Sequence, residues 1–319
     1  MRIGCPHGSP PVAGAVPRHI STGPTARVNG ALHYDYTTVG HVTIDVLEDG
    51  SRQAGGAAFY SALQAARLGL RALIVTRGLE SEIEQALERY RDELHVQVLP
   101  ARNTTTLQTS GYGSHRVQRM LAWAGPIAQD IAVDSTILHF APVARESPSR
   151  WRGQAAFVGL TPQGLVRDWS GPRKQIRTAP PTRAAARGAM LVAEQCQAVV
   201  VSEHERASCA GLIARASAAG AVIAITAGER PNTIVGPNGT EMELCVPAIA
   251  RPCDDLGAGD VFAAAFFIAL ADGRRALDAA RFANAAAAVR MSGVSAGADA
   301  IGGLAEIEAR LAAVDGAGG

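Results

Sequence analysis

Two uninterrupted apolar segments do most to limit the folds open to this chain. Residues 198–202 read Ala-Val-Val-Val-Ser, and residues 221–226 read Ala-Val-Ile-Ala-Ile-Thr. A strand without polar interruption has both faces covered, as in a parallel sheet between two layers of helices. A helical stretch at 205–219, ended by Gly220, separates the two segments. This strand-helix-strand order predicts a parallel sheet.

The alternation of strands and helices continues along the chain from Tyr34 onward, which predicts an α/β fold. Further strands are expected at 36–39, 42–47, 71–76, 94–99, 104–112, 136–140, 155–160, 234–235 and 241–246. Further helices are expected at 57–68, 80–91, 258–270, 275–291 and 304–314. We predict a three-layer sandwich with a mostly parallel central sheet flanked by helices, formed by one domain over residues 34–319. A hairpin at 46–54, with parts of 94–120, is expected to add a small β-lid.

The composition limits the classes of function. The 319 residues are 47% hydrophobic, enough for a large core, and the net charge of +1 gives no basic excess for nucleic acid or an anionic membrane. No apolar run approaches the roughly 18–20 residues of a membrane span. The five cysteines have no Cys-x-x-Cys spacing and no histidine cluster, which favours reduced thiols in the cytoplasm. Whether the chain is a monomer or a homodimer stays open.

Residues 1–33 differ from the remainder of the chain. They are rich in Pro, Gly, Ser and Thr and contain no acidic residue. We expect a disordered N-terminal tail, or a segment that follows an upstream start site. A transit segment is the alternative, which the prolines disfavour because they break an amphipathic helix.

The segment 254–267, Asp-Asp-Leu-Gly-Ala-Gly-Asp-Val-Phe-Ala-Ala-Ala-Phe-Phe, carries the strongest indication of function. A glycine turn that enters a helix leaves the first amide N–H groups unpaired, and the helix dipole favours negative charge there. Asp260 lies at this point, where a carboxylate would repel a bound anion. The arrangement suits a general base that takes a proton from a nucleophile while the amides hold a phosphoryl group. A simple helix cap is the alternative.

This segment resembles the C-terminal signature of the ribokinase-like carbohydrate kinases of the phosphofructokinase-B type, Asp-Thr-x-Gly-Ala-Gly-Asp. Asp254 and the run Gly257, Ala258, Gly259 and Asp260 match, and Asp255 stands where the family usually has Thr. The resemblance implies a kinase that uses ATP and Mg²⁺, with Asp260 as general base and the amides of 257–260 around the transferred phosphoryl group.

The resemblance extends to the N-terminal half. Residues 39–45, Val-Gly-His-Val-Thr-Ile-Asp, resemble the family's first strand, and Asp45 matches an aspartate that holds substrate hydroxyls. Gly55 and Gly56 match the family's di-glycine, which lets the backbone approach the substrate. Tyr60 departs from the pattern of ribokinases, so the resemblance does not carry over a pentose substrate. Without it, Asp45 would be an exposed residue at the end of a strand.

Further matches imply the donor site. Glu205, in Ser202-Glu-His-Glu205, matches the glutamate that orients magnesium through water, although Ser-x-x-Glu is also a helix capping box. Thr226 and Gly228 match a loop that contacts ATP phosphates and ribose. Asn284 matches a position beside the adenine, or is a buried packing residue.

These matches predict an ATP-dependent kinase that phosphorylates a hydroxyl of a small sugar or polyol. Alternatives are a nucleoside or inositol kinase on the same fold, or a ligand-binding regulator without catalysis. No Gly-x-Gly-x-x-Gly or Walker motif is found at a strand-helix junction, which argues against a dehydrogenase or a Walker-type ATPase. Four polar residues near predicted strands receive no role from the sequence: Arg116, Gln118, Gln163 and Arg167.

Overall fold

A nine-stranded sheet forms the centre of the molecule in the computed structural model, which describes residues 27–28, 31–111, 115–128, 131–171, 173–181, 183–249, 254–292 and 297–316. The strand order is β17-β16-β15-β14-β11-β10-β3-β6-β7. All neighbours from β15 to β7 are parallel, and only β16 and β17 pair antiparallel. The bounds are β3 (Tyr34–Val39), β6 (Ala72–Gly78), β7 (Leu94–Pro100), β10 (Ala132–Phe140), β11 (Arg152–Leu160), β14 (Ala198–Ser202), β15 (Val222–Thr226), β16 (Asn232–Val235) and β17 (Glu241–Leu244).

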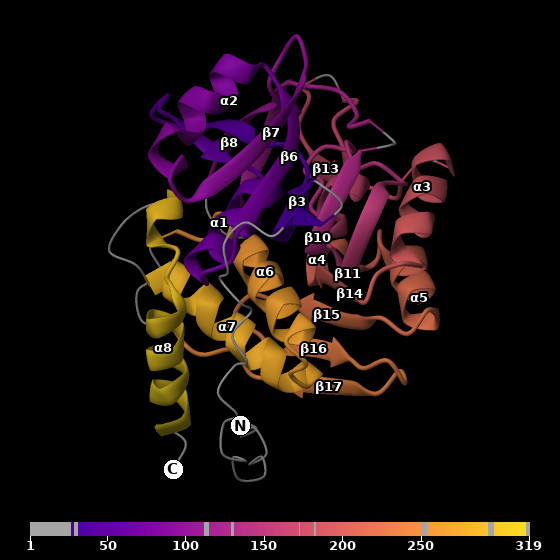
Figure 1. The fold of residues 1–319 in the computed structure, drawn as a ribbon, viewed down its shortest axis with the longest axis vertical. Coiled ribbons are helices and arrows are strands. Elements are labelled where there is room, and N and C mark those ends of the chain that lie inside the picture. Colours follow the sequence, from indigo (N-terminus) through magenta and orange to yellow (C-terminus); the bar gives the residue numbers. More distant parts are fainter. Residues whose placement is uncertain are drawn as a thin grey trace.

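Helices cover both faces of this sheet (Figure 1). One apolar layer holds α1 (Ala57–Arg67), α2 (Glu80–Leu87), α6 (Ala258–Ala271), α7 (Ala276–Ser292) and α8 (Leu304–Gly316). The other holds α3 (Arg183–Ala193) and α5 (Ala210–Ala218). Helix α6 is buried on nearly every side, which its continuous run of Ala and Phe allows. The predicted three-layer sandwich is confirmed.

A four-stranded sheet in the order β5-β4-β8-β9 forms the small lid. It consists of β4 (Thr43–Val46), β5 (Arg52–Gly55), β8 (Thr106–Ser110) and β9 (Val117–Ala122). Strand β9 was not separately predicted, and β7 extends the central sheet rather than the lid. Two short pairs complete the strands: β12 (Arg167–Asp168) with β13 (Arg177–Thr178), and β1 (Arg27–Val28) with β2 (Ala31–Leu32). The structure describes residues 27–28 and 31–33 of the predicted tail at 1–33, and the rest of that prediction lies outside the described residues.

Two local expectations are changed by the structure. The predicted helix 205–219 is divided into α4 (Glu203–Arg206) and α5, and α4 begins early because Ser202 and Glu205 form a capping box. Cys245 takes part in a disulfide, so the expectation of five reduced thiols is wrong there; the absence of a Cys-x-x-Cys motif does not exclude a disulfide. Among the described helices, none has the length and apolar character needed to cross a membrane.

The carboxyl ends of the parallel strands decide where a ligand can bind. Strand β3 lies between β6, which follows it in sequence through α1, and β10, which comes later, so the strand order reverses between β3 and β10. Open α/β sheets bind ligands outside the carboxyl ends at such a point. Three candidate residues, Asp45, Arg167 and Glu205, lie in the segments that follow β3, β11 and β14, and Thr226 is the last residue of β15.

Candidate active site

The turn before α6 has the geometry that its sequence predicts. Gly257 is the N-cap in the left-handed region, with φ of 80°. A Cβ there would lie 2.4 Å from the ring of Tyr60, so both conformation and space require glycine. Gly259 is different, because a Cβ there would have nothing within 4 Å. The open side of the turn is therefore at Gly259, where a ligand can approach the backbone.

Only part of the predicted amide cluster is free to bind an anion. The amide of Ala258 donates to Asp255 O at 3.1 Å, and that of Asp260 donates to Gly257 O at 3.0 Å. Within the described part of the chain, the amides of Gly257 and Gly259 have no hydrogen-bond acceptor. These two glycine amides, at the positive end of α6, are the donors that remain for a phosphoryl group.

The carboxyl group of Asp260 has a raised pKa. Removal from water raises the pKa of its carboxyl to about 7; the positive charge of Arg167 opposes this rise, and the carboxylate of Glu205 adds to it. A base whose pKa lies near neutrality can both accept and release a proton. The main chain of Asp260 is held by Ser61, whose hydroxyl donates to Asp260 O at 3.0 Å.

Asp45 lies in strand β4 of the lid and is buried, with 2% of its surface exposed. The Thr43 hydroxyl donates to Asp45 Oδ1 at 2.8 Å. Burial raises the pKa of Asp45 to about 6, opposed by this hydrogen bond and by Arg167 and Arg116. A Cβ on Gly55 would lie 2.3 Å from Asp45 Oδ2, so the carboxylate fits in this position only because residue 55 is glycine.

The structure gives Arg167, which received no role from the sequence, a place between the two candidate aspartates. Burial lowers the pKa of its guanidinium, and the carboxylates of Glu205, Asp260 and Asp45 counteract this. Its Nη atoms donate at 3.0 Å to Val143 O and Gln118 Oε1. The one signal in the sequence was its position just after a strand that ends at the ligand-binding edge.

Arg116 connects the lid to the turn before α6. It lies just before β9, and its guanidinium forms an ion pair with Asp255. Both side chains are about one-fifth exposed, at 23% and 22%. The charge of Arg116 also lowers the pKa values of Asp45 and Asp260. Asp255, which departs from the family signature, therefore has a partner in the lid.

Glu205 lies in the first turn of α4 and takes part in a capping box. Ser202 N donates to Glu205 Oε2 at 3.1 Å, so the capping box is present. No group of three or more His, Cys, Asp or Glu side chains is placed to hold a metal within the described residues. This fits Mg²⁺ only where the phosphates of a substrate and water supply most of the ligands, with one carboxylate from the protein.

The three residues predicted to contact ATP converge. Asn232 Nδ2 donates to Asn284 Oδ1 at 2.8 Å, and Asn232 Oδ1 accepts from Ala227 N at 3.0 Å. Asn232 thus joins the buried Asn284 of α7 to the loop that holds Thr226 and Gly228. Asn284 Nδ2 is buried without a hydrogen-bond partner in the described chain, so both of its N–H groups remain free to donate.

Known structures share this architecture. A pyrophosphate-dependent kinase in the ribokinase family, complexed with a pyrophosphate analog and myo-inositol, matches with a TM-score of 0.64 at 19% identity, covering 80% of this chain and 94% of its own. Arabidopsis thaliana ribokinase, complexed with ribose and ATP, matches at 0.64 and 15%, covering 88% and 99%. A Vibrio cholerae O395 fructokinase double mutant, with fructose, ADP and potassium bound, matches at 0.63 and 18%, covering 87% and 98%.

The sequence supports the same family. The model of the pfkB family carbohydrate kinases matches residues 171–301, the part that holds the turn before α6. No curated protein sequence matches the chain. The predicted resemblance to the ribokinase-like, phosphofructokinase-B type family is confirmed by this match and by the fold. Together they support a carbohydrate kinase, a phosphotransferase with an alcohol group as acceptor.

Proposed function

We propose that this chain is an ATP-dependent kinase that transfers the γ-phosphoryl group to a hydroxyl of a small sugar or polyol. The observation that carries the proposal is the position of Asp260, whose pKa is about 7, in the turn that leaves the amides of Gly257 and Gly259 free. The charges of Asp45 and Arg167 act on the same carboxyl.

The reaction needs one proton transfer and one exchange of phosphorus–oxygen bonds. Asp260 takes the proton of the acceptor hydroxyl, whose oxygen forms a bond to the γ-phosphorus while the bond to the ADP oxygen breaks. Negative charge on the transferred oxygens is stabilised by the amides of Gly257 and Gly259 and by the fixed charge of Arg167. Asp45 accepts hydrogen bonds from acceptor hydroxyls that do not react. Mg²⁺, held near Glu205 largely by phosphates, would neutralise charge on the donor.

The donor and the acceptor are the parts of this proposal that a screen must decide. Solved relatives include proteins complexed with ATP and ribose and with a pyrophosphate analog and myo-inositol. We therefore propose a matrix of donors (ATP, GTP and pyrophosphate, each with Mg²⁺) against four separate groups of acceptors: sugars, polyols other than inositol, myo-inositol, and nucleosides. The readout is the appearance of the phosphorylated acceptor. Fastest turnover with ATP and a sugar or polyol supports the proposal.

Two other results would replace it. Fastest turnover with pyrophosphate, or with inositol or a nucleoside, would keep the machinery and change the substrate. No phosphorylated product in any combination, together with tight binding of a sugar, would indicate a regulator that retains the fold without catalysis.

A further inference from the structure

Arg290 is the largest fully buried side chain in the described part of the protein. It lies in the last turn of α7, next to Val289, on a helix otherwise rich in alanine. A guanidinium group stays charged at any physiological pH, and moving a charge into the protein interior is costly unless it is paired and hydrogen-bonded. The groups that bind the Arg290 side chain therefore indicate why a charge is buried at this position.

Within the described residues, the side-chain hydrogen bonds of Arg290 all go to the segment just before the Gly257 turn. Its Nη2 donates to Asp254 Oδ2 at 2.7 Å and to Leu256 O at 2.7 Å, and its Nη1 donates to Asp254 O at 3.3 Å. The other carboxylate oxygen of Asp254 accepts from Leu256 N at 2.9 Å. Two carbonyls and one carboxylate thus surround the guanidinium.

The bond to Leu256 O has a direct effect on the anion-binding turn. The carbonyl of Leu256 and the N–H of Gly257 belong to one planar, trans peptide unit, in which C=O and N–H point in opposite directions. Because Arg290 holds the carbonyl on the inner side, the Gly257 N–H points to the opposite side. This N–H is one of the two amides that have no acceptor in the described chain. The ring of Tyr60 packs against Gly257 and limits its movement.

We infer that Arg290 is a positioning residue for phosphoryl transfer, an internal cation that orients the Gly257 amide and places positive charge beneath the anion site. The role in turnover rests on the proposed function; the role in anion binding does not. Since the guanidinium already occupies this group of oxygens, turnover is independent of monovalent cations. Carbonyl and carboxylate oxygens are also ligands for hard cations. Removal of the guanidinium therefore leaves a hole that an external cation can fill.

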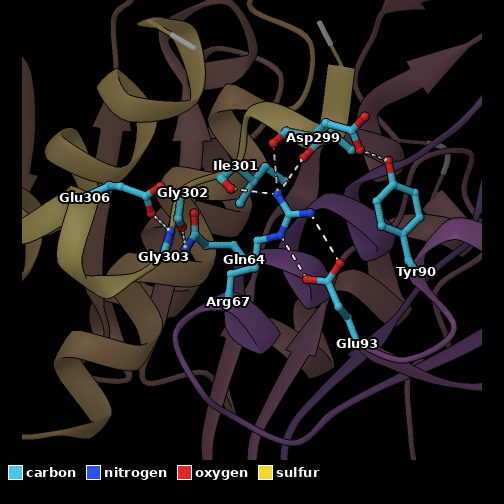
Figure 2. Close-up of polar contacts among 10 residues, drawn as sticks. Gln64, Arg67, Tyr90, Glu93, Asp299, Ile301, Gly302, Gly303 and Glu306 are labelled. Atoms are coloured by element: carbon cyan, nitrogen blue, oxygen red, sulfur yellow. Dashed lines mark hydrogen bonds and ion pairs between the residues drawn. The ribbon is translucent and has the colours of Figure 1, made fainter. Parts of the chain in front are cut away.

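The test compares three variants with the unmodified full chain. Arg290→Ala removes the cation and Arg290→Lys keeps a positive charge. Arg67→Ala is a matched control, because the Arg67 guanidinium also donates to backbone carbonyls, those of Ala298, Asp299 and Ile301, at 2.7–3.2 Å (Figure 2). Arg67 joins α1 to the segment before α8 and has no contact with the 254–260 turn among its described interactions.

The expected result is specific to position 290. Turnover of the unmodified chain is the same in sodium, potassium, ammonium and tetramethylammonium salts. Arg290→Ala lowers kcat by roughly 10²–10³-fold, the scale of a lost oxyanion donor, with a much smaller change in acceptor KM. Low concentrations of guanidinium or potassium restore part of this loss, and Arg290→Lys retains more activity than Arg290→Ala. Arg67→Ala lowers the melting temperature, leaves kcat near wild type and gains no response to cations.

A second readout does not depend on turnover. Calorimetric titration with pyrophosphate, used as a probe of the anion site, is expected to give a weaker Kd for Arg290→Ala than for the unmodified chain and Arg67→Ala. If no variant and no wild-type protein shows kinase activity, but Arg290→Ala still binds pyrophosphate more weakly than the other proteins, the proposed kinase function is rejected. The role of Arg290 in anion binding is then kept. Strong activation of the unmodified chain by potassium, or wild-type kcat and pyrophosphate affinity in Arg290→Ala, would overturn the inference. The potassium experiment decides even if Arg290→Ala does not fold.

Discussion

Neighbouring aspartates in the turn before α6 form ion pairs of opposite character. Asp254 pairs with Arg290 of α7, whose side chain has no exposed surface. Asp255 pairs with Arg116, which comes from the lid, and both side chains are about one-fifth exposed. In the Asp254–Arg290 pair the arginine also donates to backbone carbonyls, whereas Arg116 makes no such bond within the described part of the chain.

This difference teaches how one turn can be rigid and adaptable at once. The Asp254–Arg290 pair, called the inner pair, holds the peptide units that orient the Gly257 amide. Breaking it would either expose the buried guanidinium to water or leave it buried without its carboxylate. The Asp255–Arg116 pair is called the outer pair. The outer pair is partly hydrated, so breaking it costs little. We therefore expect the inner pair to control stability and the rate of the chemical step, and the outer pair to control the approach of the lid and of the substrates.

The largest effect is expected at Asp260, which follows both pairs in the same turn. This effect sets the upper limit for the change in turnover that the loss of either pair can cause. Asp260→Asn should lower kcat by on the order of 10²–10⁴-fold, because the general base is lost, while donor binding persists. The measurement is steady-state kinetics with the best acceptor. Asp272→Asn, at the other end of the same helix, is the matched control and should remain near wild type. Turnover near wild type in Asp260→Asn would remove the proposed base.

Loss of the inner pair is expected to be next in size. Asp254→Ala leaves the buried guanidinium of Arg290 without its carboxylate and should lower the free energy of unfolding by about 3 kcal/mol, the lower end for a broken buried pair, because Asp254 itself is 27% exposed. Denaturant unfolding measures this loss. An effect no larger than that of Asp255→Ala would break the comparison.

Asp45 tests the lid side of the site. If it accepts hydrogen bonds from two acceptor hydroxyls, Asp45→Ala should lower kcat/KM for the acceptor roughly tenfold to a hundredfold, mostly through KM, with the KM of ATP nearly unchanged. Asp49→Ala, in the exposed turn of the lid, is the control. A normal KM in a variant that unfolds easily would make Asp45 a structural residue instead.

The pH dependence of the rate and of the stability tests the raised pKa of Asp260. Asp260 acts as a base only when ionised, so kcat should rise with pH through about 7, the raised pKa of this group. Stability has the opposite sign: a carboxyl whose pKa is raised by folding contributes stability at low pH that is lost as pH rises through about 7. In Asp260→Asn the rise of kcat with pH should disappear. Above about pH 7 its melting temperature should be higher relative to that of the wild type than it is at low pH. A difference in melting temperature that stays constant with pH would contradict the assignment.

The smallest effect is expected for the outer pair. Arg116→Ala should change the free energy of unfolding by less than about 1 kcal/mol, because water partly hydrates this ion pair. Because the charge of Arg116 lowers the pKa of Asp260, its removal should shift the rise of kcat to higher pH. Arg119→Ala, exposed on β9 of the same lid, is the control and should leave the pH dependence of kcat unchanged. A loss of stability as large as that of Asp254→Ala would show that the two pairs are equivalent.

The sequence by itself determined the layers of the fold and the turn at the anion site. Apolar strands and alternating helices report local periodicity, and they predicted the sandwich and most of its elements. The roles of Gly257 and Asp260 could be predicted for the same reason, because a glycine turn that enters an apolar helix is a local pattern in the sequence. The division of 205–219 into α4 and α5 and the separate strand β9 were missed, since packing and pairing decide where short elements end.

Only the tertiary structure decided which charges meet. Arg167 and Arg116 are separated from Asp260 by 93 and 144 residues in the printed sequence, yet both act on its pKa. Arg290 had no motif at all, because an arginine in an alanine-rich helix is indistinguishable in sequence from one that faces water. A charge receives its role from the groups that surround it in space, and distant segments bring those groups together only when the parallel strands align their carboxyl ends.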